Sequence, residues 1–235
     1  MRRGLVLLPA LCSAISGQDA FTPAKEAALG EQMSRSIRAQ ARIVQDPAVR
    51  GYVSRLATRL AGPNVLLTLD VTDDDQNLTH EPLWLPGGYV FVSGALIRTA
   101  RDESEFAGMF AHALAHEIGH DTARMSADAI APVFVAGSPL PQALAARRRP
   151  FELEADALAV RMTAAVGYDP EAFARYISRV DAADTERIAA LRKAIRELPA
   201  QEVAVIDSSE FQRVRERLMP GAQGMPPTLV HAGER

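Results

Sequence analysis

The segment His116-Glu-Ile-Gly-His120 carries the clearest chemical signal in this sequence. Residues four apart lie on the same face of a helix, so the imidazoles of His116 and His120 can bind one metal ion. Glu117 then lies beside the open coordination position, where its carboxylate can accept a proton from a water molecule on the metal. This order of residues is typical of a hydrolytic zinc site.

The motif ends a segment with the pattern of an amphipathic helix. Asp102, followed by Glu105 three residues later, predicts where that helix begins. Apolar residues then recur at helical spacing, which predicts a buried face that anchors the helix; they are Phe106, Met109, Phe110, Ala113, Leu114 and Ile118.

A site with two histidines needs a third protein ligand, and the segment Phe151-Glu-Leu-Glu-Ala-Asp156 offers carboxylates. Glu152 and Asp156 are four residues apart on a second predicted helix, so both point the same way. We expect Glu152 to complete the ligand set and Asp156 to accept a hydrogen bond from a ligand histidine, which would orient its ring. Glu154 is the rival ligand, but an offset of two residues puts it on a different face from Asp156.

Three motifs in this order resemble the HtpX- and BepA-like gluzincin metallopeptidases, a family that includes the CaaX prenyl proteases. They are Leu85-Pro-Gly-Gly-Tyr-Val-Phe-Val92, His-Glu-x-x-His and Glu-x-x-x-Asp, and the similarity runs from about Asp70 to Val180. The resemblance implies zinc-dependent hydrolysis of peptide bonds with one Zn²⁺ per chain. It assigns the metal ligands to His116, His120 and Glu152, the general base to Glu117 and the supporting carboxylate to Asp156.

His112 departs from the family pattern, because it stands four residues before His116 and extends the pair to a ladder. His112 with His116 is therefore an alternative metal pair, but Ala113 then stands where the base should be. We favour His116 and His120 as the metal pair, because Glu117 then stands where the base should be. His112 is interpreted as an accessory polar group or a partly buried histidine beside the site.

The late His-Pro of the family is also absent, since the chain reads Asp181-Ala-Ala-Asp-Thr-Glu-Arg-Ile188 there. Another group would have to stabilise the oxyanion, with Tyr168, Tyr176 and Arg161 as unranked candidates. This departure leaves a second class of function open, a catalytically weak or inactive member that binds envelope proteins as a chaperone-like factor. A third reading, a helical structural protein with an accidental motif, predicts no bound metal.

Two segments ahead of the metal helix, 65–71 and 89–92, predict strands, because β-branched and aromatic residues lie between glycine and proline breaks. An exposed edge strand could pair with an extended substrate, and its candidate residues are Gly87, Gly88, Tyr89 and Val90. The alternative is a tight turn that leads into an ordinary core strand.

The N-terminus has the features of a secretory signal peptide. A basic start at Met1-Arg-Arg precedes the apolar run Leu5–Ile15, and small residues follow at Ser16 and Gly17. The apolar run is too short to span a bilayer. We therefore expect a periplasmic or secreted protein with no transmembrane span in the mature chain.

Length and hydrophobic content suit one domain, since 235 residues with 48% hydrophobic side chains can bury one core. We expect a signal peptide at 1–17, a single metallopeptidase domain at 18–219 and a flexible tail at 220–235. The expected fold class is α+β and mostly helical, with a small sheet beside the metal helix. The other predicted helices span 23–61 with a break at Asp46-Pro47, 152–166, 170–180, 184–197 and 208–218.

A net charge of −3 argues against a nucleic-acid partner, so the expected partner is a polypeptide substrate. The basic run Arg147–Arg149 is interpreted as a solvated loop, with Pro150 helping to define the start of the Glu152 helix. The apolar segment 129–140 has three readings: it lines the substrate cleft, contacts a membrane surface, or covers the core. The last is the simplest.

Overall fold

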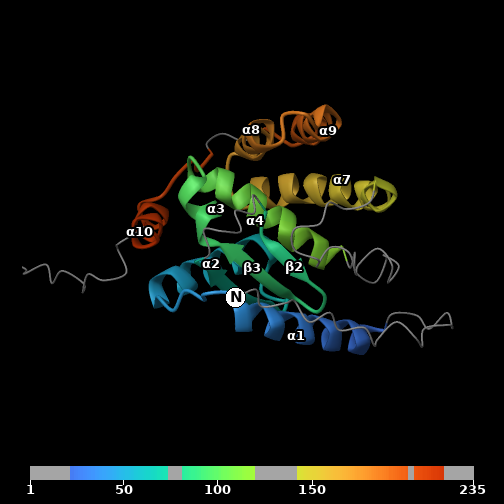
Figure 1. Ribbon diagram of the computed structural model, residues 1–235. Coiled ribbons are helices and arrows are strands. Elements are labelled where there is room, and N and C mark those ends of the chain that lie inside the picture. Colours follow the sequence, from blue (N-terminus) through green and yellow to red (C-terminus); the bar gives the residue numbers. More distant parts are fainter. Residues whose placement is uncertain (1–21, 74–80, 120–141, 201–203, 220–235) are drawn as a thin grey trace, which may run out of the picture.

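The fold comes from a computed structural model that describes residues 22–73, 81–119, 142–200 and 204–219. These residues form a mostly helical α+β structure with a small three-stranded sheet, the fold class that the sequence predicts (Figure 1). The predicted signal peptide, the tail at 220–235 and the apolar segment 129–140 lie outside the described residues. None of the described helices has the length and hydropathy needed to cross a membrane.

The first two helices begin at prolines that follow a capping side chain. In α1 (Pro23–Gln40), Thr22 accepts a hydrogen bond from the Lys25 amide. In α2 (Pro47–Ala61), Asp46 accepts from the amides of Ala48 and Val49. Proline is well suited to the first helical position, where its missing N–H is not needed. The predicted break at Asp46-Pro47 is therefore confirmed.

The sheet contains β1 (Thr68–Thr72), β2 (Leu83–Leu85) and β3 (Tyr89–Ser93) in the order β1-β3-β2. Strand β3 pairs in parallel with β1 and antiparallel with β2. The proposal that Tyr89 and Val90 belong to an exposed edge strand is wrong, because the backbone of β3 is paired on both sides. The short strand β2, which the sequence did not predict, occupies the edge.

The predicted substrate glycines form the turn between β2 and β3. Gly87 and Gly88 have φ angles of 75° and 82°, a region that side chains with a Cβ rarely adopt. A Cβ on Gly87 would lie 2.8 Å from the Ala27 Cα in α1, and one on Gly88 would lie 2.4 Å from the Leu66 carbonyl oxygen. Glycine is required here by the turn and by the chain's own close approach.

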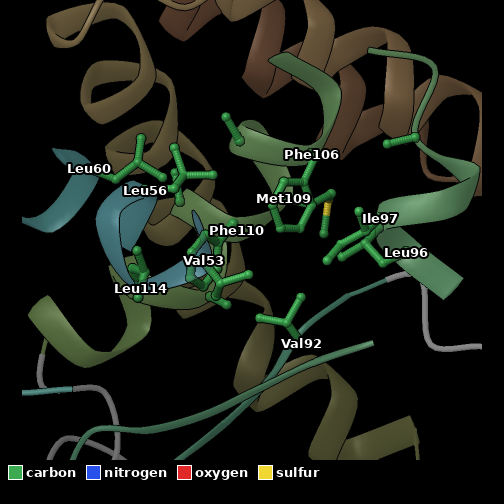
Figure 2. Packing of buried hydrophobic residues seen from close by; sticks show 14 of the residues in the cluster. Val53, Leu56, Leu60, Val92, Leu96, Ile97, Phe106, Met109, Phe110 and Leu114 are labelled. Atoms are coloured by element: carbon green, nitrogen blue, oxygen red, sulfur yellow. The ribbon is translucent and has the colours of Figure 1, made fainter. Parts of the chain in front are cut away.

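The metal helix of the sequence analysis is α4 (Glu103–Ile118), which follows the short helix α3 (Gly94–Thr99). The predicted cap is confirmed, since Asp102 Oδ1 accepts a hydrogen bond of 2.8 Å from the Glu105 amide. Helix α4 is buried on nearly every side and packs against α2, α7, α8 and the sheet. Figure 2 shows its apolar residues meeting side chains of α2, α3 and β3 in one core.

The remaining helices are α7 (Gln142–Ala165), α8 (Pro170–Val180), α9 (Thr185–Arg196) and α10 (Ser209–Arg217). Helices α7, α8 and α9 lie on one side of α4, whereas α1 lies across the sheet on the other side (Figure 1). Helix α7 packs on α4, and α9 packs on α7 and α8, so residues far apart in sequence meet there.

Helix α7 begins earlier than predicted, because Pro150 lies inside it and does not define its start. An internal proline removes one backbone hydrogen bond and crowds the carbonyl four residues earlier, yet α7 continues through Pro150. The expectation of a solvated arginine loop is wrong for Arg149. Its guanidinium forms ion pairs with Asp184 and Glu186 at the start of α9, which hold this part of α7 in place.

Gly108 allows α4 and α8 to pack closely, because a Cβ there would lie 2.5 Å from the Phe173 Cβ. We expect Gly108→Ala to lower the free energy of unfolding by about 1–3 kcal/mol through overpacking. Gly51→Ala in α2 is the control, since the nearest atom to its new methyl group is the flexible end of Arg55. Urea unfolding of both variants tests this, and wild-type stability of Gly108→Ala would contradict it.

Candidate metal centre

Three side chains from α4 and α7 converge in the middle of the structure. His112 and His116 are one turn apart on α4, and both are almost fully buried; Glu152 comes from α7. His112 Nε2 lies 3.2 Å from His116 Nε2 and 3.3 Å from Glu152 Oε2. His116 Nε2 lies 3.5 Å from the same carboxylate oxygen. The three donor atoms therefore form a nearly regular triangle.

This triangle has the dimensions of a zinc site. Zinc binds imidazole nitrogen and carboxylate oxygen at about 2.0–2.2 Å, which places the ligand atoms of a tetrahedral site about 3.3–3.5 Å apart. The observed separations of 3.2, 3.3 and 3.5 Å match these values. Two imidazoles with one carboxylate can therefore hold a metal ion and leave a fourth position open.

Asp156 lies behind this triangle, one turn after Glu152 on α7. Its Oδ1 is 2.8 Å from His112 Nδ1, the ring nitrogen that faces away from the other two donors. The two atoms are close enough for an ion pair, but they are poorly aligned for a hydrogen bond. A carboxylate in this place favours the tautomer that leaves Nε2 free to bind a metal. The sequence predicted this kind of role for Asp156, and the imidazole that it contacts is His112.

Arg187, in the first turn of α9, binds Asp156 from the other side. Its Nε donates to Asp156 Oδ2 at 2.7 Å and its Nη2 donates to Oδ1 at 2.9 Å. Its Nη1 also donates to Glu81 Oε1 at 2.9 Å. Both Arg187 and Asp156 are buried, so this two-point ion pair is shielded from water.

Trp84 covers the second imidazole. Its ring, in strand β2, stacks on that of His116 with centroids 4.7 Å apart and planes inclined by 17°. The rings of His112 and His116 meet edge to face, also at 4.7 Å. Trp84 therefore fixes the plane of the His116 ring, as Asp156 fixes that of His112.

The charges of the cluster are strongly coupled. Burial alone would lower the pKa of His112, but Asp156 and Glu152 outweigh it and raise that pKa to about 10. Burial would raise the pKa of Glu152, but contacts with the two imidazoles hold it well below the ordinary value. The pKa of Asp156 is lowered against burial by His112 and Arg187. These carboxylates are therefore charged at neutral pH, and a metal ion would compete with the proton on His112.

The predicted ligands are placed as follows. His116 and Glu152 come together as the sequence analysis proposes, and His112 lies in the same group of donor atoms. His120 lies outside the described residues. Glu154 is exposed and lies outside the three-residue group. Of the oxyanion candidates, Tyr168 donates its hydroxyl to Glu103 at the other end of α4 and is therefore unsuitable.

Glu117 is half-buried and points towards the turn between β2 and β3. Its Oε1 lies 3.6 Å from the position that a Cβ on Gly88 would occupy. If His112 and His116 are the ligands, the residue that follows the first ligand is Ala113, and Glu117 lies about one helical turn further along α4. If His116 and His120 are the ligands, Glu117 directly follows the first of them. The two ligand sets share His116 and Glu152.

Two residues of the site were not found from the sequence. Trp84 is the single tryptophan of the chain, but its strand is only three residues long and follows Pro82. Arg187 lies in a charged helix start, where arginine is ordinarily solvated, and its partner Asp156 is 31 residues away. Neither residue has a local sequence signal of a role at a metal centre.

Comparison with known proteins identifies the class. Residues 45–138 match the model of peptidase family M48, and this range includes both predicted histidine pairs and Glu117. This match confirms the resemblance to the BepA-like metallopeptidases.

One protein with a similar sequence is the Beta-barrel assembly-enhancing protease of Yersinia pestis. The chain is 31% identical to it over 189 residues, which cover 66% of this chain and 37% of the relative. The chain thus spans little more than a third of the length of that protein.

Proposed function

We propose that this protein is a zinc-dependent endopeptidase. The observation that carries the proposal is that the buried imidazole of His116, with that of His112 beside it, lies at zinc-ligand spacing from Glu152 of α7. In this proposal His116, His120 and Glu152 hold one Zn²⁺, and Asp156 supports the centre from behind. The match to peptidase family M48 supports the same reaction class.

Zinc in such a site lowers the pKa of water towards about 7 and polarises a peptide carbonyl. Glu117 accepts a proton from the attacking water and passes it to the leaving amine. In the structure its carboxylate is half-buried beside Gly88, in the turn that leads into β3. Trp84 restricts the motion of the His116 ring, so this ligand is held in place before substrate binds, and Asp156 holds the neighbouring ring of His112.

The proposed substrates are exported or envelope polypeptides, met in the periplasm or outside the cell. The signal-peptide pattern at 1–17 supports this location, and the name of the Yersinia relative refers to the assembly of β-barrel proteins. An extended substrate would pair with the outer edge of β2, because no backbone hydrogen bond from the described residues reaches that edge. Trp84 would then place the substrate backbone beside His116.

A second function is favoured by one observation, the place of His112. With His112, His116 and Glu152 as ligands, Ala113 stands where the base belongs, and the centre would hold zinc without hydrolysing peptides. The protein would then be a zinc-containing member that binds envelope proteins as a chaperone-like factor.

The variants His120→Ala and His112→Ala separate the two functions. As a hydrolase, the zinc-loaded protein should digest casein until a chelator is added, and His120→Ala should lose both zinc and cleavage. His112→Ala should still bind zinc and cleave, but with zinc affinity lowered about 10–100-fold, because His112 supports both His116 and Glu152 without being a ligand. The proposal fails if His112→Ala loses zinc while His120→Ala retains it, or if the zinc-loaded wild type cleaves no unfolded protein.

A further inference from the structure

Arg187 joins Asp156, the supporting carboxylate of the metal centre, to Glu81, which lies two residues before the edge strand β2. We propose that Arg187 is a positioning residue for the metal centre and sets its affinity for zinc. This inference rests on the proposed zinc site, and it assigns a role to a residue in α9 that touches neither metal nor substrate.

The first step is the geometry of the Arg187–Asp156 pair. The planar guanidinium binds both carboxylate oxygens, at 2.7 and 2.9 Å, so the Asp156 carboxylate cannot rotate without breaking a bond. The oxygen held at 2.9 Å, Oδ1, is also the one that lies 2.8 Å from His112 Nδ1. Arg187 therefore determines where Asp156 points its charge.

The second step is burial. The exposed fractions are 6% for Arg187 and 1% for Asp156, so water cannot replace either partner. Removing one partner of a buried ion pair leaves an uncompensated charge, and the structure must then rearrange around it. Without Arg187, Asp156 would have to turn towards solvent or take up a proton. Either change would release the His112 ring.

The third step is the contact with Glu81. Arg187 Nη1 donates to Glu81 at 2.9 Å, just before strand β2 begins. Strand β2 carries Trp84, which stacks on His116. One side chain is therefore connected to both imidazoles, to His112 through Asp156 and to His116 through the start of β2.

Arg187 is itself held firmly. Its amide donates to the capping residue Asp184 at 2.9 Å, and Asp184 also pairs with Arg149 of α7. Helix α7 is the element that carries Glu152 and Asp156. The start of α9 and the ligands on α7 are therefore fastened to each other at two places, so the guanidinium keeps its place relative to Asp156.

The test is the zinc affinity of the full-length protein, measured by competition with a chromophoric chelator. Loss of an outer side chain that supports a metal centre typically costs about 10–100-fold in metal affinity, and we expect this loss for Arg187→Met. Arg187→Lys keeps the charge but not the two-point contact, so its affinity should lie between those of Arg187→Met and the wild type. Arg192→Met, an exposed position on the same helix, should bind zinc like the wild type.

A merely structural role would lower the melting temperature of the metal-free protein and leave zinc affinity unchanged. The inference is overturned if folded Arg187→Met binds zinc like the wild type. If Arg187→Met does not fold, Arg187→Lys decides, and unchanged zinc affinity in that variant overturns the inference equally. A wild type that binds no zinc would instead overturn the proposed function and this inference with it. Wild-type zinc binding without cleavage would refute the hydrolase alone.

Discussion

Replacing Glu117 by glutamine is expected to abolish cleavage of casein while zinc stays bound. The amide has the size of the carboxylate but cannot accept a proton from water. General-base catalysis contributes about 10²–10⁴-fold to a rate, so kcat should fall by at least that factor while KM changes little. The measurement is casein hydrolysis by the zinc-loaded variant, together with its zinc content.

The zinc content serves as the control, because it distinguishes loss of the base from loss of the site. Glu117 is half-buried beside Gly88, and glutamine fits the same space. Activity retained in Glu117→Gln would refute the assigned base. It would also direct attention to another proton acceptor near the open side of the centre.

Glu152→Ala is expected to lose the metal, since Glu152 is the carboxylate ligand in both proposed arrangements of the centre. Its carboxylate lies 3.3 and 3.5 Å from the two imidazole nitrogens, and no second carboxylate lies in the described ligand group. Loss of a ligand should cost more than the roughly 10–100-fold that loss of an outer partner costs. The measurement is equilibrium zinc binding by the purified variant.

Glu154→Ala is the matched control, two residues away on the same helix and exposed to solvent. It should bind zinc like the wild type. If both variants bind zinc equally well, Glu152 is not a ligand. If Glu154→Ala loses zinc and Glu152→Ala keeps it, the rival assignment weighed in the sequence analysis is the correct one.

Much of the helical framework could be predicted from the sequence, because helix ends have local causes. Asp102 caps α4 and Asp169 caps α8 just where side-chain oxygens precede a helical pattern. The same reasoning did not place the start of α7. Pro150 is locally a helix-start signal, but the ion pairs of Arg149 with α9 hold helical residues before it.

The sheet was predicted less well, because the place of a strand depends on partners that are distant in sequence. The pattern at Tyr89 predicts a strand, but whether that strand lies at an edge depends on β1 and β2. Strand β2 has only three residues, too few for an alternating pattern to be recognised. The sequence analysis therefore assigned the edge position to the wrong strand.

Which pair of histidines faces Glu152 could not be predicted for a similar reason. Along α4, the spacing of His112 to His116 is the same as that of His116 to His120. Which pair faces Glu152 depends on how α7 packs against α4, and Asp156 meets His112 in that packing. The helical pitch alone predicts both pairs equally well.

The central claim is that His116 and Glu152 meet at one zinc ion. Anomalous diffraction at the zinc absorption edge, from crystals of the zinc-loaded protein, tests it most directly. We expect one strong peak per chain, about 2.0–2.2 Å from His116 Nε2 and from a Glu152 oxygen. A peak bound elsewhere, or no peak near these two side chains at full zinc loading, would contradict the account.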